Sequence, residues 1–186
     1  MNNIKYLGLI VVTILLLVTC KKEFHFKHKD ITETDGSGNY VGNINPNDWQ
    51  LRSIADLSSF EKSILLQIPI HFSVPNDDTS KLDTIDVNLF GCIDTFQFNM
   101  VAFPNPMQNS KLQLRINSNL PYKRVYILIT DKKGNFITGT YSSNSIEIVE
   151  YDMPPLVNRD FIFHYLFITE DNCAYYGRGN VIGSKK

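Results

Sequence analysis

The chain has 186 residues, of which 43% are hydrophobic and 12% aromatic, enough for one folded domain of ordinary size with a linker. Eighteen Lys and Arg residues balance nineteen Asp and Glu residues, which leaves a formal net charge of -1. This balance argues against nucleic-acid partners, because those need a strongly basic surface. The excess of Phe and Tyr over Trp favours a β-rich body over disorder.

The first 19 residues have the pattern of an export signal. Lys5 supplies a short basic start, and residues 6–18 form a nearly unbroken apolar run. A membrane-spanning helix needs about 20 apolar residues, so this run is too short to span. We expect residues 1–19 to be a cleavable signal peptide; the alternative is an uncleaved membrane anchor.

A lipid-attachment motif follows this signal. Leu17-Val18-Thr19-Cys20 resembles the lipobox of bacterial lipoproteins, although Thr19 stands where Gly, Ala or Ser is usual. The resemblance implies that Cys20 becomes the lipid-bearing first residue of the mature protein. Several acyl chains anchor a protein because each buried methylene contributes about 0.8 kcal/mol. Lys21 at the second mature position, by the same resemblance, favours the outer membrane, on its periplasmic or cell-surface face.

Two further cysteines, Cys92 and Cys173, remain after Cys20 is assigned to lipid. An exported location permits them to form a disulfide, which would contribute on the order of 4 kcal/mol in a chain-entropy account. The alternative is two separate buried thiols that act as small apolar residues. No C-x-x-C spacing occurs, so the sequence predicts neither a zinc site nor a cofactor.

The segments before the main body read as a linker and an extension. Residues 20–46 are polar and rich in turn residues, which predicts a flexible linker. Residues 47–94 form an N-terminal extension, in which residues 64–75 read as an edge strand because of their prolines. A short helix is also expected there, with Ser58 or Ser59 as its cap, from the apolar spacing of Trp49, Leu51, Ile54, Leu57 and Phe60.

Residues 95–186 alternate between apolar and polar positions, as strands with one buried face do. Turns are expected at residues 103–106 and 132–135. Short strands at such intervals, of about five to nine residues each, suit two sheets that bury each other's apolar faces. The sequence therefore predicts an all-β fold, an antiparallel β-sandwich, with strands near residues 95–102, 112–117, 125–130, 136–141, 145–151, 161–169 and 174–182.

Three segments carry a resemblance to a known family. They are the Asn47-Asp48-Trp49 entry, residues 100–106 with the strands that follow, and the closing hairpin of residues 161–182. Together they resemble small secreted lipoproteins of Bacteroidetes-type bacteria. The resemblance implies an immunoglobulin-like β-sandwich behind a signal peptide and a tether, and it implies no particular activity.

The residue types that carry catalysis are scattered. The four histidines are His25, His28, His71 and His164, and the last lies in an aromatic strand, where an ordinary sheet residue is expected. The acidic residues between 77 and 86 lack the glycine and glutamate of an EF-hand loop. No G-x-S-x-G and no phosphate-binding glycine loop occurs. We therefore expect no catalytic residues and no enzyme.

The last predicted hairpin holds the candidate binding surface. Tyr175, Tyr176 and Arg178 offer flat aromatic contacts and a charge beside a strand edge. Together with the anchor, they predict a non-catalytic module of the cell envelope that binds a protein or a glycan. The alternatives are a structural subunit of an outer-membrane assembly and, third, a hydrolase.

Overall fold

The computed structural model describes residues 27–52, 56–68, 98–108, 110–119, 121–143, 146–152, 159–170 and 173–183. Residues 1–19, predicted to be a signal peptide, lie outside this part, as do Cys20 and Cys92. The described elements are η1 (His28–Asp30), β1 (Leu51–Arg52), α2 (Ser59–Leu65), β2 (Phe98–Gln108), β3 (Lys111–Ser118), β4 (Tyr122–Thr130), β5 (Phe136–Ser142), β6 (Ile148–Asp152), β7 (Asp160–Thr169) and β8 (Ala174–Ile182). None of the described helices is long and apolar enough to cross a membrane.

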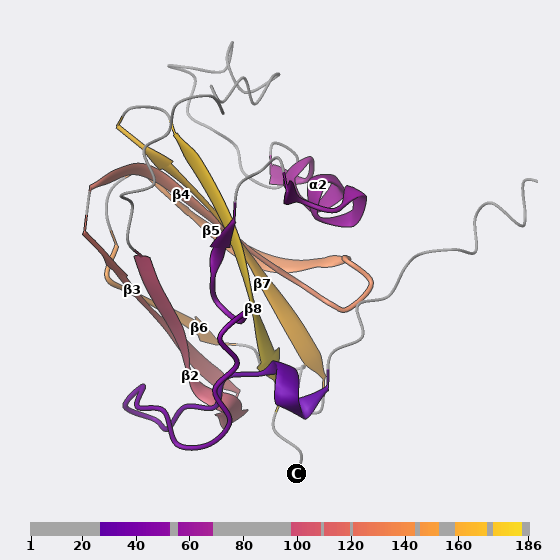
Figure 1. The fold of residues 1–186 in the computed structure, drawn as a ribbon, viewed down its shortest axis with the longest axis vertical. Coiled ribbons are helices and arrows are strands. Elements are labelled where there is room, and N and C mark those ends of the chain that lie inside the picture. Colours follow the sequence, from indigo (N-terminus) through magenta and orange to yellow (C-terminus); the bar gives the residue numbers. More distant parts are fainter. Residues whose placement is uncertain are drawn as a thin grey trace, which may run out of the picture.

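The strands form two facing sheets, as Figure 1 shows. One has the order β1-β8-β7-β4-β5 and the other the order β2-β3-β6, with every neighbouring pair antiparallel. From β2 to β8 the strand order resembles that of a seven-stranded immunoglobulin domain, except that the fourth strand, β5, lies on the sheet of the third, sixth and seventh strands. The antiparallel sandwich expected from the sequence is confirmed.

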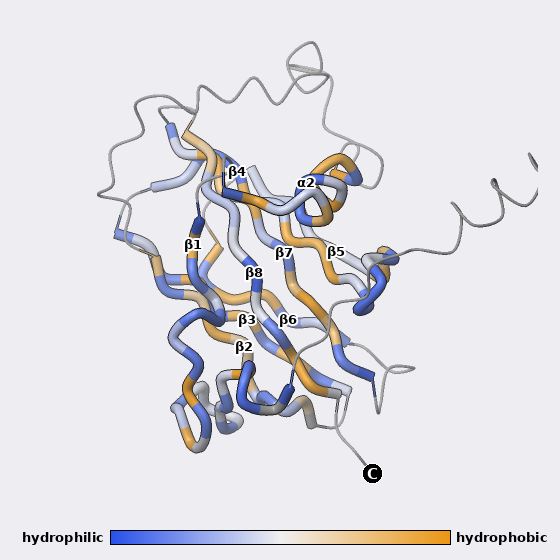
Figure 2. The backbone as a smooth tube through the Cα atoms, turned by 45° about the vertical axis from the view of Figure 1, so that its right-hand side comes forward, coloured by the Kyte–Doolittle hydropathy of each residue, from blue (hydrophilic) through white to orange (hydrophobic). Residues whose placement is uncertain are grey.

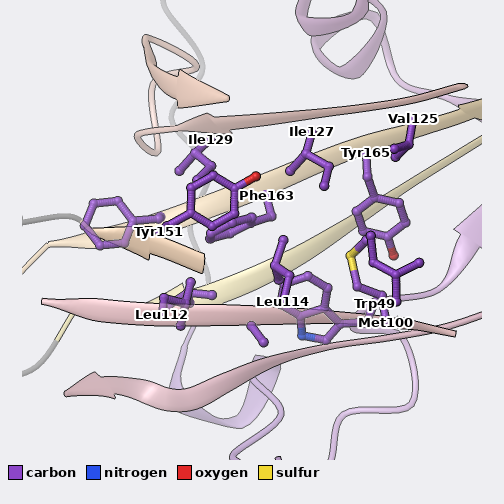
Figure 3. Close-up of a cluster of buried hydrophobic side chains, with 14 of the residues drawn as sticks. Trp49, Met100, Leu112, Leu114, Val125, Ile127, Ile129, Tyr151, Phe163 and Tyr165 are labelled. Carbon is purple, nitrogen blue, oxygen red and sulfur yellow. The ribbon is translucent and has the colours of Figure 1, made fainter. Parts of the chain in front are cut away.

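The core lies between the two sheets. On β3, Leu112, Leu114 and Ile116 are buried, while their neighbours in sequence are exposed or half-buried. Figure 3 shows Leu112 and Leu114 facing side chains of β4 and β7, among them Ile127 and Phe163. Burying one such side chain contributes about 1.5–3 kcal/mol, so this alternation determines which face of β3 turns inward.

A second apolar cluster lies on the outer face of the five-stranded sheet. Helix α2 covers this face, as Figure 2 shows, and its residues Ile64 and Leu65 pack against the sheet. Tyr126 and Leu128 of β4 and Tyr176 of β8 are fully buried there. The central strands are therefore buried on both faces, which is why residues 125–130 are all buried rather than alternating.

Helix α2 begins where the sequence predicted a cap. The Ser58 hydroxyl accepts a hydrogen bond from the Glu61 backbone N–H at 3.3 Å, and the Glu61 carboxylate accepts one from the Ser58 backbone N–H at 2.9 Å. This reciprocal pair satisfies amides that the first turn leaves free. The apolar spacing upstream was misleading, because Leu51 belongs to strand β1. Ile64 and Leu65 lie in α2, so the extended segment expected from residue 64 was wrong at its start, and residues 69–75 lie outside the described part.

The flexible linker expected over residues 20–46 is wrong for its described part, residues 27–46. Ile31 is 1% exposed and Thr34 is 3% exposed. Thr34 forms a β-bridge with Asn105, and its hydroxyl donates to the Ala102 carbonyl at 2.6 Å. The polar residues that suggested a linker instead bind the backbone, as when the Asn43 amide donates to the Lys29 carbonyl at 3.0 Å.

The turn expected at residues 103–106 is also wrong. Strand β2 continues to Gln108, with an irregular register against β3 between Phe103 and Gln108. The chain reverses later, where Ser110 adopts a φ of 62° just before Lys111 pairs with Gln108. The irregularity turns Asn105 into the interior, where it is fully buried.

Trp49, from the predicted extension of residues 47–94, completes the core of the sandwich. Its ring stacks on Tyr165 at 6.2 Å and lies 5.9 Å from Phe163, both on β7. Its backbone lies in the left-handed region, with a φ of 62°, and its N–H donates to the Arg178 carbonyl at 3.0 Å. The indole lies directly over Gly179, so a Cβ there would collide with it. Residues 95–186 therefore do not contain the whole core.

We predict that Gly179→Ala lowers the free energy of unfolding by about 1–3 kcal/mol, because the new methyl group displaces the indole of Trp49. Urea unfolding, followed by tryptophan fluorescence, measures the change on the only Trp of the chain. Gly36→Ala is the matched control, since a Cβ at Gly36 meets nothing within 4 Å. Equal stability of Gly179→Ala and the unmodified protein would show that Trp49 does not occupy this position.

Candidate functional site

Four residues form a buried polar network, here called the clasp: Thr32, Asp48, Asn105 and Asn180. The Asp48 carboxylate accepts hydrogen bonds from the backbone N–H groups of Thr32 and Asn180, both at 2.9 Å. The Asn105 amide donates to the Thr32 carbonyl at 2.8 Å and to the Asn180 carbonyl at 3.0 Å. The clasp thus joins the N-terminal segment to β2 and β8 through main-chain groups.

Asp48 is a buried titratable group within this polar network. Burial raises its pKa to about 6, against the opposing effect of the hydrogen bonds from Thr32 and Asn180 and of the positive charge of Arg178. The side chain is 5% exposed, and both of its oxygens accept backbone hydrogen bonds. Asp48 therefore has a structural role, because it joins the backbone at Thr32 to the backbone at Asn180 of β8.

A second polar cluster lies beneath α2, around His164. The His164 Nδ1 lies 2.6 Å from the Tyr176 hydroxyl, and its Nε2 lies 3.0 Å from the Thr130 hydroxyl. Burial lowers the pKa of His164 to about 3, so the ring is neutral near pH 7. Both ring nitrogens are engaged and the side chain is fully buried, which confirms the sheet position expected for it.

Glu61 connects α2 to the edge of the sheet. Its carboxylate pairs with the Arg52 guanidinium, and Arg178 Nη1 lies 3.6 Å from Glu61 Oε1. Burial acts to raise the pKa of Glu61, but hydrogen bonds from Ser58 and the charges of Arg52 and Arg178 outweigh it, so the pKa is lowered. A buried carboxylate held by two guanidinium groups fixes the start of α2 over β1 and β8.

The surface predicted from Tyr175, Tyr176 and Arg178 is not formed. Tyr176 is fully buried against His164, and Tyr175 packs on the opposite face, against the core between the sheets. The Arg178 side chain is 30% exposed and takes part in the ion pair with Glu61. Alternation along β8 separates Tyr175 from the other two, and helix α2 covers the face that Tyr176 and Arg178 share.

Cys173 follows β7 in the turn to β8 and is disulfide-bonded. Its N–H donates to the Thr169 hydroxyl at 3.1 Å, which holds the turn together. Cys92 lies outside the described residues, so the pairing of Cys92 with Cys173 stays a prediction. In the described ranges, no three His, Cys, Asp or Glu side chains gather where they could hold a metal ion.

An open cleft of about 520 Å³ lies where β3 ends and where β4 and β6 begin. Tyr122 fixes its wall, because its hydroxyl donates to the Ile146 carbonyl at 2.8 Å and accepts from the Ile146 N–H at 2.7 Å. Asn117 and Glu147 are exposed, and Ile148 is 54% exposed. The cleft is lined by Arg115, Ile116, Asn117, Ser118, Asn119, Pro121, Tyr122, Ile146, Glu147 and Ile148.

Sequence reasoning missed this cleft, because two stretches about 30 positions apart form it and neither carries a recognisable motif. The pairing that brings them together is that of β3 with β6, for example Arg115 with Ile148. A run of polar residues between two predicted strands was the one available signal, and such runs are common in ordinary turns.

The cleft and the clasp lie at opposite ends of the sandwich. Along β7, Ile162 pairs with Asn180 of the clasp, and Thr169 pairs with Tyr122 of the cleft. These positions are seven residues apart, or about 23 Å at about 3.3 Å per residue. Figure 1 shows the indigo N-terminal segment near the C-terminal label, away from the turn that joins β7 to β8. We call the two ends the clasp end and the loop end.

No family model and no curated protein matches the sequence. Among solved structures, a match is "The crystal structure of CopC from Methylosinus trichosporium OB3b", with 14% sequence identity and a TM-score of 0.36. The match covers 48% of this chain and 95% of that chain. A likeness at this level carries no argument about function.

We predict that His164→Gln changes how stability depends on pH. The folded pKa of about 3 lies below the ordinary 6.5, so between these values the unfolded chain binds more protons. His164 therefore makes the protein less stable as the pH falls from about 6.5. Denaturant unfolding at pH 7, 6, 5 and 4 should show that the free energy of unfolding falls less steeply with falling pH in the variant than in the unmodified protein. If the free energy of unfolding falls in parallel for the two proteins, His164 is not buried and neutral in the folded state.

We predict that Asp48→Asn changes the pH dependence of stability in the opposite direction. The folded pKa of about 6 lies above the ordinary 3.8, so between these values the folded chain binds more protons, and Asp48 favours folding as the pH falls. Relative to the variant, the unmodified protein should gain stability from pH 6 to pH 4. Asp35→Asn is the control, because hydrogen bonds from Asn39 lower the pKa of Asp35. No relative gain would show that Asp48 titrates normally.

Proposed function

We propose that the chain is a lipid-anchored, non-catalytic binding module of the bacterial envelope that takes a protein or glycan partner in its cleft. The observation that carries the proposal is the position of the cleft at the loop end, opposite the clasp that holds the N-terminal segment at Thr32. In immunoglobulin variable domains, loops at one end of the sandwich form the binding site. The β3–β4 connection, which lines this cleft, corresponds to one of them.

The chemistry of the cleft supports a binding role. The Asn117 side chain can both donate and accept hydrogen bonds, as sugar hydroxyls and peptide groups require. Glu147 adds a negative charge and the exposed Ile148 adds an apolar contact, whereas the Arg115 guanidinium is held by the Ser37 carbonyl at 3.2 Å and lies over the Phe103 ring. Ile116 and Tyr122, each 4% exposed, belong to the packed core, so the cleft is built on a rigid scaffold.

The buried titratable residues of the described part support a structural rather than a catalytic role for those groups. Asp48 accepts two backbone hydrogen bonds, Glu61 is held by two arginines, and His164 is hydrogen-bonded through both ring nitrogens. Catalytic acids and bases need a substrate within hydrogen-bond reach. All three lie outside the set of residues that lines the cleft.

The test is binding by the detergent-solubilised lipoprotein to glycan arrays and to proteins of envelope extracts. We predict that the double variant Asn117→Ala, Ile148→Ser weakens binding by at least about tenfold, equivalent to about 1.4 kcal/mol. Both side chains are exposed, so the fold should not change. Val41→Ser is the matched control, because Val41 is 63% exposed and lies outside the cleft. A partner that binds the double variant and the unmodified protein equally would show that the cleft is not the binding site.

A further inference from the structure

Asn180 of the clasp fixes the chain at Asp30, ten residues after Cys20. The Asp30 carbonyl accepts hydrogen bonds from the side-chain amides of Asn45, at 2.9 Å, and Asn180, at 3.2 Å. The Lys27 N–H donates to the Asp30 carboxylate at 2.7 Å, and Ile31 is 1% exposed. Lys27 is therefore held on the folded body, and it stands seven residues after Cys20 in the sequence.

Seven residues span at most about 25 Å when fully extended, and a flexible chain of that length spans about 15 Å on average. A free linker over residues 20–46 could have spanned about 90 Å. The β7 strand alone, with ten residues, is about 33 Å long. The connection to Cys20 is thus shorter than the sandwich itself, and the body cannot rotate freely above a lipid surface.

We infer that the clasp end of the sandwich lies against the phospholipid headgroups and that the cleft faces away from the membrane. This inference rests on the lipid anchor at Cys20 in the proposed function, and it adds the orientation. Lys27 and Lys29 are exposed at the clasp end, and positive charges there are favoured beside anionic headgroups. The cleft then lies about 23 Å farther from the lipid, which places it within about 50 Å of the headgroups.

The orientation limits how far from the membrane a partner of the cleft can lie. A partner of the cleft has to lie within about 50 Å of the membrane in which the protein is anchored, because the short connection gives the cleft no greater reach. A surface glycan or a protein of the same membrane meets this demand.

Energy transfer in vesicles tests the orientation. The mature lipoprotein is placed in phosphatidylethanolamine and phosphatidylglycerol vesicles that carry an acceptor dye on their headgroups. A donor dye is attached at Arg159→Cys, at the clasp end, or at Ser143→Cys, at the loop end; both positions are exposed. The unmodified protein, in which Cys173 is disulfide-bonded, gives the labelling background. We expect strong transfer from position 159 and weak transfer from position 143, with a difference in donor height on the order of 20 Å.

A matched insertion variant carries a flexible stretch of Gly and Ser residues, about twenty long, between Phe26 and Lys27. The insertion is expected to remove most of the difference, because the flexible connection then approaches the length of the sandwich. Vesicle flotation, with Cys20→Ser as the unanchored control, reports on the anchor separately. Protein that floats but transfers equally from both positions overturns the orientation alone. Protein that floats no better than Cys20→Ser overturns the anchor and the orientation together.

Discussion

The fold depends on two side chains, Asp48 and Asn105, that satisfy main-chain groups of two separate segments in the interior, the N-terminal segment at Thr32 and β8 at Asn180. Buried N–H and carbonyl groups without partners cost about 1–3 kcal/mol each, so these segments can meet only where the polar side chains reach them. The irregularity in β2 that turns Asn105 inward is the feature that makes this possible. It also explains why the N-terminal segment packs tightly although its composition is that of a linker.

Buried polar side chains also hold the two layers that cover the inner and outer faces of the five-stranded sheet. On the inner face, Trp49 enters the core over Gly179, next to the clasp. On the outer face, α2 covers His164 and Tyr176, and Glu61 joins the helix to Arg52 and Arg178. Histidine, tyrosine and carboxylate side chains that would suggest catalysis on an open surface are here bound to one another or to the backbone. These side chains hold α2 on the sheet.

The proposed function and orientation follow from the direction of the chain. The segment from Lys27 is held at one end of the sandwich, and the cleft is lined by strand ends and connections at the other. With the proposed lipid anchor at Cys20, the short connection would hold the clasp end toward the membrane and the cleft away from it.

The sequence alone determined the sandwich, most of its strands and the cap of α2, because these depend on local alternation and on spacing within a few residues, as at Ser58 and Glu61. It also carried the predictions of a signal peptide and a lipid anchor. Only the tertiary structure decided that the segment from residue 27 is fixed, that Tyr176 is buried and that a cleft exists. Those features come from contacts between distant residues, such as Asp48 with Asn180, and a local pattern holds no information about which distant residues meet.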